Sequence, residues 1–406
     1  MKILLVNKFH YLKGGSEKYY FELGKLLKKM GNSVAYFSME DEKNIKTGDK
    51  EYFVKKIDLN TGSKLKALDV IYSNENYQKM KEAIEDFKPD IVHLNNFQRQ
   101  LSASIVKACN DKNVPIVFTS HDMQAICPAS SMLCNGKICE ECIEKGYISC
   151  INKNCIKNSK LKSILAVIEA KYYRRKNIYA KIDYIISPSE FIKRQLIKGK
   201  IKYKRMETLH NFVLDNGRKE NLSNKGYAFY FGRLSIEKGI LDVLHAIKNI
   251  ENAKLIIAGD GPEKEKIIEF IQKNNLEEKV KLVGYLNQDE IRKYIQESKF
   301  VVVPSIWYEN CPYSILETME IGKPIIGSNI GGIPELIENG KNGYLYKFGN
   351  IEELSEKMNI LFSDDILAKK QTRMSRELYE QKYNEKYYYE EIMKIYENLI
   401  KERKNV

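Results

Sequence analysis

The 406-residue sequence lacks any long hydrophobic run, which argues against a membrane-spanning helix. Such a helix needs about 18 or more consecutive apolar residues, whereas the apolar run at residues 300–303 is ended by Pro304. The apolar residues 3–6 are followed by Asn7, which leaves too short a core for a secretory signal peptide. We therefore expect a cytoplasmic protein, in which clustered cysteines stay reduced and favour metal binding over disulfides.

The sequence also lacks the low hydrophobicity of disordered chains, because 43% of its residues are hydrophobic and 11% are aromatic. Its length allows two domains at about 100–200 residues each. The formal net charge is +13, but residues 156–206 hold 15 Lys and Arg against 3 Asp and Glu, a net +12. This local excess indicates an anionic partner, which is a nucleic acid, a membrane surface or a phosphorylated substrate.

Short apolar runs alternate with helix-periodic segments in two series, which is typical of parallel α/β sheets. The expected strands are 2–6, 34–37, 91–94, 115–119, 184–186 and 207–209, then 227–231, 254–258, 280–283, 300–303 and 324–327. We predict an α/β protein with two Rossmann-like, doubly wound domains facing across a cleft. Their predicted bounds are 1–210 and 211–382, and a terminal helix at 383–406 is expected to pack back toward the first domain. Open parallel sheets bind ligands at the carboxyl ends of their strands.

Two strand ends of the second series carry residues suited to an anion. Arg233 follows the strand at 227–231, and Lys238 precedes a helix, so both cations are expected beside free backbone N–H groups. Charges and helix dipole at such a place favour a diphosphate; solvated surface cations are the alternative. Residues 258–262, Ala-Gly-Asp-Gly-Pro, form a second tight turn whose side chains need touch no ligand.

A third segment contains two carboxylates eight residues apart, Glu309 and Glu317, around a turn with Pro312 at the expected first helical position. A carboxylate accepts hydrogen bonds from the hydroxyls of a ribose or another sugar. Ordinary solvated glutamates are the alternative. A glycine-rich turn at residues 328–335 is consistent with a close backbone approach.

The ordered set of Gly-Arg-Leu-x-x-Glu-Lys-Gly, Gly-Asp-Gly-Pro, Val-Gly-Tyr-Leu at 283–286, Glu-x7-Glu and Gly-Gly-Ile-Pro-Glu resembles the family-4 retaining glycosyltransferases of the GT-B fold. The resemblance covers nearly all of residues 1–380. It implies transfer of a sugar, with retention of configuration, from a UDP- or GDP-sugar to a glycan or lipid-linked acceptor in cell-surface polysaccharide synthesis.

The same resemblance assigns roles to residues. It implies that Arg233 and Lys238 hold the diphosphate, Glu317 the ribose and Glu309 the transferred sugar. It places Gly284 beside the base. Further donor-binding positions are implied where backbone amides hold the sugar and phosphates, around Asn310, Cys311, Pro312 and Tyr313.

Two motifs of the first half agree with this resemblance. Gly15 resembles the family's glycine-rich loop near acceptor and phosphate, and His121 resembles its histidine that touches the donor sugar. A plain helix entry and a loop histidine are the alternatives. Glu309 and His121 are our candidate catalytic residues. The sequence has no Asp-x-Asp triplet, so we expect no catalytic metal and assign the leaving-group charge to Arg233, Lys238 and helix amides.

Six of the eight cysteines lie in an insertion at residues 127–155. The spacing Cys139-x2-Cys142-x7-Cys150-x4-Cys155 suits a tetrahedral zinc ion, and Cys127 or Cys134 could replace one ligand. The insertion has few apolar residues, so a metal would stabilise it. We predict a structural zinc; reduced, buried cysteines without metal are the alternative.

The basic stretch includes a helical pattern from Leu161 to Ala180 in which cations alternate with Tyr172, Tyr173 and Tyr179. Such interleaving suits an anionic membrane surface, here the inner face of the membrane; a solvated helix face is the alternative. Two other functions stay open. A zinc-containing basic nucleic-acid-binding protein would not need the donor motifs, and we expect no nucleic-acid partner. A GT-B-fold sugar-nucleotide epimerase is weakened by the Glu-x7-Glu and Gly-Arg-Leu patterns.

Overall fold

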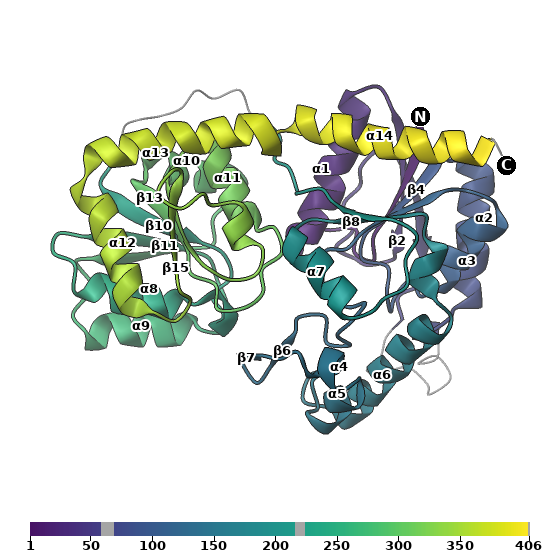
Figure 1. Cartoon of the computed structure of the whole chain (residues 1–406), viewed down its shortest axis with the longest axis horizontal. Helices are drawn as coiled ribbons and strands as arrows, with labels where there is room; N and C mark the ends of the chain where they lie inside the picture. The colour runs from purple at the N-terminus through teal and green to yellow at the C-terminus, as the bar shows by residue number, and fades with distance from the viewer. Residues whose placement is uncertain (58–68, 216–223, 405–406) are drawn as a thin grey trace. The chain divides into compact units, whose positions relative to one another are not determined.

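The computed structural model describes residues 1–57, 69–215 and 224–404, which divide into two compact units. Unit 1 holds Met1–Asn211 and Tyr388–Val406, and unit 2 holds Phe212–Tyr387. Each unit is built on one parallel sheet with helices packed against it (Figure 1).

The sheet of unit 1 has seven parallel strands in the order β3-β2-β1-β4-β5-β8-β9. The order reverses between β1 and β4, which is where open α/β sheets bind ligands. The strands are β1 (Lys2–Val6), β2 (Ser33–Met39), β3 (Lys50–Val54), β4 (Ile91–Leu94), β5 (Ile116–Thr119), β8 (Tyr184–Ser187) and β9 (Met206–Thr208).

Helices of unit 1 connect these strands. They are α1 (Gly15–Lys29), α2 (Asn74–Phe87), α3 (Ser104–Asp111), α6 (Lys160–Arg175), η2 (Ile178–Lys181) and α7 (Glu190–Lys198). The cysteine insertion between β5 and α6 forms the hairpin β6 (Leu133–Cys134) and β7 (Lys137–Ile138), then α4 (Glu141–Glu144) and α5 (Ile148–Asn152). α5 packs against α6.

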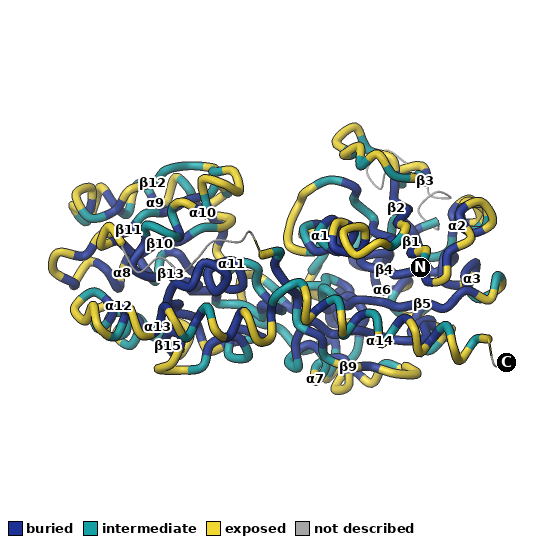
Figure 2. Tube along the Cα trace, turned by 90° about the horizontal axis from the view of Figure 1, so that it is seen from above, coloured by how far each residue is buried: buried dark blue, intermediate teal, exposed yellow. Residues whose placement is uncertain are grey.

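Helix α14 (Glu385–Lys404) returns to unit 1. Its buried residues, spaced by three or four, are Tyr388, Ile392, Tyr396 and Leu399, and Figure 2 shows the resulting alternation of buried and exposed residues. Buried His93 on β4 contacts the Tyr396 hydroxyl through Nδ1 and Thr119 Oγ1 through Nε2 at 2.7 Å. Polar side chains thus join α14 to the centre of the sheet.

The sheet of unit 2 has six parallel strands in the order β12-β11-β10-β13-β14-β15. Its order reverses between β10 and β13. The strands are β10 (Tyr227–Phe231), β11 (Lys254–Ala258), β12 (Val280–Gly284), β13 (Phe300–Val303), β14 (Ile325–Ser328) and β15 (Gly343–Tyr346). The helices are η3 (Ile236–Lys238), α8 (Ile240–Lys248), α9 (Lys264–Lys273), α10 (Gln288–Glu297), α11 (Tyr313–Ile321), η4 (Ile333–Glu335), α12 (Ile351–Ser363), α13 (Asp365–Leu378) and η5 (Tyr379–Tyr383).

The expected strands are all confirmed within two residues at each end. They are recognisable because strands covered on both faces are continuous apolar runs. Strands β3 and β15 were not predicted, since each lies at a sheet edge and mixes buried with partly exposed residues. The helix expected from Ile333 is a single 3₁₀ turn, and Pro312 is the N-cap of α11 rather than its first residue.

Candidate functional site

The carboxyl ends of β10, β11 and β12 touch through glycine backbones. The Gly232 N–H donates to the Ala258 oxygen (3.1 Å), and the Gly259 N–H donates to the Gly284 oxygen (2.7 Å). Gly259 has φ 138°, and a Cβ there would lie 1.9 Å from the Gly232 oxygen. Only glycine fits such a contact. The turn at residues 258–262 therefore holds three strand ends together at one edge of the sheet.

Glu309, in the loop between β13 and α11, is buried, and its Oε1 accepts three hydrogen bonds. The donors are Lys238 Nζ at 2.6 Å, Ser305 Oγ at 2.6 Å and Trp307 Nε1 at 2.9 Å. Burial alone would raise the pKa of Glu309, but the Lys238 charge and these hydrogen bonds hold that pKa below its usual value. Glu309 is therefore an ionised partner of Lys238 at neutral pH.

The glycine-rich turn at residues 328–335 packs against the backbone of Glu309. The Gly332 N–H donates to the backbone carbonyl oxygen of Glu309 at 2.8 Å. A Cβ on Gly331, whose φ is 62°, would lie 2.4 Å from the same oxygen. The close backbone approach expected for this turn is thus made to the Glu309 backbone.

Other predicted donor-binding residues lie in unit 2 at strand or helix ends. Arg233 is exposed just after β10, and Gly284 ends β12 with open space around its Cα. Glu317, inside α11, is buried and accepts a hydrogen bond from Gln288 Nε2 at 2.7 Å. The neighbouring Tyr285 is 82% exposed. Sequence analysis missed the anchoring roles of Gln288, Ser305 and Trp307, which no motif indicates.

The segment Asn310, Cys311, Pro312 and Tyr313 leads into α11. Pro312 is the N-cap, and Cys311 is buried. The first N–H groups of a helix have no acceptor within it and favour anions. The chain therefore directs the backbone donors of α11 to the carboxyl edge of the sheet, the edge from which Glu309 also projects.

At the switch point of unit 1, polar side chains after β1, β4 and β5 are hydrogen-bonded together. Asn95 donates to the Val6 oxygen (3.2 Å) and accepts from His121 Nε2 (2.9 Å). The Asn96 N–H donates to Asn7 Oδ1 at 3.1 Å. The asparagines were missed, although the Asn-Asn pair directly after the strand at 91–94 was an available signal.

The hydrogen bond fixes the tautomer of His121. Because the Asn95 amide nitrogen donates to Val6, its oxygen faces the ring, so Nε2 of His121 carries the proton. Burial lowers the pKa of His121 to about 3. The imidazole is thus neutral at physiological pH, with Nδ1 as its acceptor atom.

Gly15 begins α1, directly after the N-cap Gly14. The next residues are tied to the switch point, since Ser16 Oγ accepts from Asn96 Nδ2 (2.9 Å) and buried Glu17 accepts from Asn7 Nδ2 (3.3 Å). Gly15 therefore lies at the same sheet edge as His121.

The cysteines of the insertion are all free thiols and form two close groups. Cys142 hydrogen-bonds Cys127, and Cys155 lies beside Cys150 with its Sγ 3.9 Å from that of Cys134. The Sγ of Cys139 instead lies 4.0 Å from Lys153 Nζ. Within residues 1–57, 69–215 and 224–404, no group of three or more His, Cys, Asp or Glu side chains is arranged to hold a metal ion. The predicted zinc ligands Cys139, Cys142, Cys150 and Cys155 are thus not gathered around one point.

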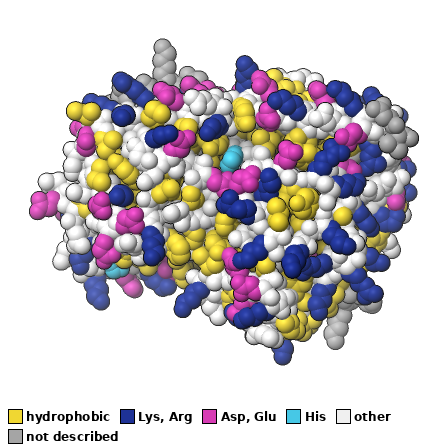
Figure 3. All heavy atoms as spheres, in the orientation of Figure 1, with side chains coloured by type: hydrophobic (Ala, Val, Ile, Leu, Met, Phe, Trp, Pro, Cys, Tyr) yellow, Lys and Arg dark blue, Asp and Glu magenta, His cyan; other side chains and the backbone are white. Residues whose placement is uncertain are grey.

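The expectation that the tyrosines of the basic stretch reach a membrane surface is wrong for two of them. Tyr173 and Tyr179 are 4% and 5% exposed, and their rings pack on Phe97 and Phe118. The cations of this stretch are solvent-exposed, and Figure 3 shows many Lys and Arg side chains on the face of unit 1 turned to the viewer. Among the described residues, no helix is long and apolar enough to cross a membrane.

Two family profiles match nearly the whole chain. Residues 13–214 match Glycosyltransferase Family 4, and residues 215–381 match Glycosyl transferases group 1. These matches, with two parallel α/β units, define a glycosyltransferase of the GT-B fold. The chain belongs to the group 1, family 4 glycosyltransferases.

Individual glycosyltransferases and one solved structure are also similar to this chain. A glycosyltransferase of Methanocaldococcus jannaschii, described as uncharacterized, is 36% identical over 46% of this chain and 52% of its own length. The poly(ribitol-phosphate) alpha-N-acetylglucosaminyltransferase of Staphylococcus aureus is 31% identical over 44% of this chain and 36% of its own. The chain thus spans about half the length of these curated relatives, or less. The Anabaena protein HepE, solved with UDP, has the same fold, with a TM-score of 0.70 at 16% identity over 98% of this chain and 100% of its own.

Proposed function

We propose that the protein transfers a sugar, with retention of configuration, from a UDP- or GDP-sugar to a glycan or lipid-linked acceptor. The observation that carries this proposal is the Lys238–Glu309 pair at the switch point of unit 2, which places a cation and a buried carboxylate at one sheet edge. A nucleotide sugar has a diphosphate that suits the cation and sugar hydroxyls that suit carboxylates.

Different residues of the site bind different parts of the nucleotide-sugar donor in this proposal. Arg233, Lys238 and the N-terminal amides of α11 neutralise the diphosphate and the charge that builds on it as the sugar leaves. Glu317, oriented by Gln288, accepts from the ribose. Exposed Tyr285 beside Gly284 offers a ring on which the base stacks.

Glu309 acts in this proposal as a fixed negative charge. Its Oε1 is held by three donors, and its low pKa disfavours proton uptake. Such a carboxylate orients the sugar and stabilises positive charge at the anomeric carbon. Neutral His121 exchanges hydrogen bonds with sugar hydroxyls and transfers no proton at neutral pH.

For the acceptor, we propose a glycan or lipid-linked saccharide of cell-surface polysaccharide synthesis, handled in the cytoplasm at the inner face of the membrane. The exposed cations of residues 156–206 support this, since they attract an anionic surface. One relative is named for a phosphate polymer, poly(ribitol-phosphate).

The first prediction tests Glu309. A thermal-shift panel of UDP- and GDP-sugars identifies the donor, because a bound ligand raises the apparent stability. With that donor, we expect Glu309→Gln to lower nucleoside diphosphate release about 10²- to 10³-fold, the cost of removing a preorganised charge from an active site. The exposed Glu251 in the same unit gives a matched control, Glu251→Gln, with unchanged turnover.

Equal turnover in Glu309→Gln and the parent protein would contradict the role of Glu309. Conversion of the donor to an isomeric nucleotide sugar without nucleoside diphosphate release would instead identify an epimerase. Salt-sensitive binding of random oligonucleotides, with no donor binding, would identify the nucleic-acid-binding alternative.

We also propose that the cysteine insertion binds one structural zinc ion. Two thiolates on a tetrahedral zinc, each about 2.3 Å from the metal, lie roughly 3.8 Å apart, which is close to the Cys134–Cys155 separation of 3.9 Å. The proposed ligands are therefore Cys134, Cys142, Cys150 and Cys155, and zinc would have to draw the Cys127–Cys142 pair toward the other three thiols, because no three ligands are gathered in the described residues. The second prediction is about one zinc per chain by elemental analysis of freshly reduced protein, lost in Cys134→Ser and kept in Cys109→Ser. Protein without metal would overturn it.

A further inference from the structure

Unit 1 has a basic pocket at the end of α6 that the donor site does not include. The cavity measures about 290 Å³, and four cations line it: Arg174 and Arg175 from α6, and Lys200 and Lys202 from the loop between α7 and β9. No carboxylate is among its lining residues. Within the described residues, no salt bridge is formed by any of the four cations, so their charges are available to a ligand.

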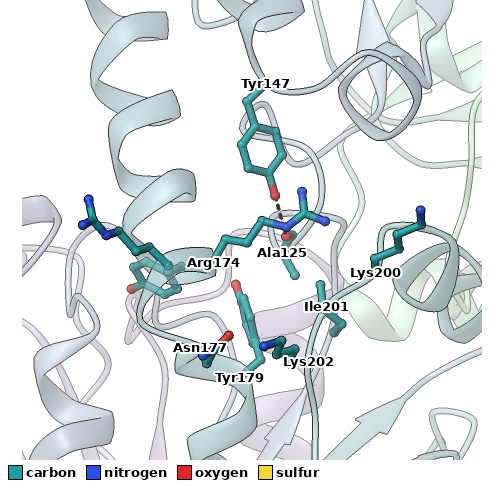
Figure 4. A pocket seen from close by; sticks show the side chains of 10 residues that line it. Ala125, Tyr147, Arg174, Asn177, Tyr179, Lys200, Ile201 and Lys202 are labelled. Carbon is teal, nitrogen blue, oxygen red and sulfur yellow. Dashed lines mark hydrogen bonds between the residues drawn. The ribbon is translucent and has the colours of Figure 1, made fainter.

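The pocket is preorganised around Arg174. Its Nη2 donates to the Gly199 oxygen at 2.6 Å, and its guanidinium lies 5.6 Å from the ring centroid of Tyr147. The Tyr147 hydroxyl in turn donates to the Ala125 oxygen at 3.3 Å. Figure 4 shows Arg174 reaching toward Ala125 and Tyr147, with Lys200, Ile201 and Lys202 on the neighbouring loop. Gly199 and Tyr147 thus hold one guanidinium, whose fork geometry matches a phosphate.

The loop that carries Lys200 and Lys202 packs closely against its neighbours in unit 1. A Cβ on Gly199 would lie 2.2 Å from Ile126 Cγ2, so this residue packs directly under the segment that follows His121. Lys200 has φ 54°, a left-handed conformation in which glycine or asparagine is usual after a helix. A lysine in this conformation is less favourable for the backbone free energy than a glycine would be.

Tyr173, one of the residues that line the pocket, has a hydroxyl without a hydrogen-bond partner among the described residues. Tyr173 is 4% exposed. Buried polar groups are nearly always paired. The Tyr173 side chain would have to shift before this hydroxyl could contact a ligand in the pocket, because the hydroxyl is closed to solvent.

A second, smaller cavity adjoins the basic pocket and shares Ala125, Tyr173 and Tyr179 with it. It measures about 10 Å³, the space of roughly one water molecule, and its lining adds Gln98, Gln124 and the buried carboxyl group of Glu169. Gln124 and Ala125 follow His121 by only three and four residues, so part of the lining of both cavities is close in sequence to the histidine at the switch point of unit 1.

We propose that the basic pocket binds a phosphate or diphosphate ester and, resting on the proposed function, that this group belongs to the acceptor. Such an acceptor is either a sugar diphosphate on a lipid or a soluble sugar phosphate, since both present the same oxyanion. The donor diphosphate is held separately by unit 2.

The third prediction tests this pocket in the full-length protein with inorganic pyrophosphate as the probe. The double variant Arg175→Gln/Lys202→Gln removes two exposed lining charges. The control Lys171→Gln/Lys176→Gln removes two exposed charges of the same stretch that do not line it. By calorimetry, we expect the dissociation constant for pyrophosphate to rise about tenfold or more in the pocket variant, the loss of charge-assisted hydrogen bonds, and less than about twofold in the control.

Because the donor site also attracts diphosphates, Arg233→Gln is measured beside these variants. Binding lost in Arg233→Gln and retained in the pocket variant assigns the probe to unit 2 and overturns the proposal. Equal weakening in the pocket variant and the charge control reduces the effect to net charge and also overturns it. Pocket-dependent binding in a protein that shows no donor activity would sustain the pocket and reject the proposed function.

Vesicles distinguish the two sources of the phosphate. Co-sedimentation with phosphatidic acid vesicles that exceeds that with phosphatidylglycerol vesicles of equal content, and that is abolished in the pocket variant only, identifies a lipid-borne phosphate. Pocket-dependent pyrophosphate binding without pocket-dependent co-sedimentation identifies a soluble phosphate ester.

Discussion

Glu169 on α6 is a buried carboxyl group beneath the adjoining cavity of unit 1. Its Oε1 accepts from the Arg99 N–H at 2.9 Å, and its Oε2 lies 3.7 Å from Arg99 Nε. Burial raises the pKa of Glu169 to about 7, although the Arg99 charge opposes the rise. Burial thus outweighs the ion pair, and the folded protein retains a proton here that the unfolded chain releases near pH 4.5.

The fourth prediction follows from this proton. Between about pH 4.5 and 7 the native state binds more protons than the unfolded state, so the stability falls as the pH rises. The stability of the parent protein, relative to Glu169→Gln, should therefore fall by about 3 kcal/mol across that window and level off above pH 7. Urea-unfolding midpoints measured at intervals of pH test this, and exposed Glu75→Gln should show no such trend. A pH-independent difference would refute it.

Single residues also show where sequence reasoning stops. Lys238 and Glu309 were recognisable from their motifs, but the donors Ser305 and Trp307 were not, because a hydrogen bond to a loop carboxylate leaves no periodic pattern. The proposed zinc ligands illustrate the same limit. Cysteine spacing located the insertion, whereas the turn at β6 and β7 decides that Cys134, rather than Cys139, lies next to Cys155.

At the scale of elements, the loops at the strand ends of unit 2 depend on glycines for two different reasons. Gly331 and Gly340 both have left-handed φ angles, 62° and 82°. A Cβ on Gly331 meets the Glu309 backbone, whereas a Cβ on Gly340 meets nothing within 4 Å. The pair therefore separates the conformational cost of a side chain from its steric cost.

The fifth prediction uses that pair. Gly340→Ala should lose about 1 kcal/mol of stability, the cost of a left-handed alanine, with unchanged donor turnover. Gly331→Ala should lose a further 1–3 kcal/mol or so, and it should lower the turnover because the loop must shift Glu309 away from Lys238. Thermal unfolding and nucleoside diphosphate release of both variants test this. Equal turnover would show that the turn does not position Glu309.

The elements that the sequence specifies most clearly are those covered on both faces. The central strands of both sheets are mostly apolar, with few polar residues such as His93 on β4, so their positions follow mainly from hydrophobic burial. Edge strands and short turns are decided by neighbours distant in the sequence. β15, for example, pairs with β14 through residues 325–328 and carries glycine and tyrosines rather than an apolar run.

At the scale of the whole molecule, the structure redistributes the charge of the basic stretch. Lys198 pairs with Glu140 and Arg205 pairs with Glu402, two carboxylates outside residues 156–206. A count along the sequence could not foresee this, because it assigns each charge to its own segment. Arg174, Arg175, Lys200 and Lys202 share a cavity, so the fold gathers part of the surplus charge at one local site.

The return of α14 to unit 1 has a consequence for synthesis. Tyr388 and Tyr396 supply hydroxyls to the buried polar chain around His93 and Tyr19, yet they follow all of unit 2 in the chain. Domains usually fold in order from the N-terminus. Here residues 212–387, which build unit 2, are synthesised before α14, so unit 1 cannot be completed until unit 2 has been made.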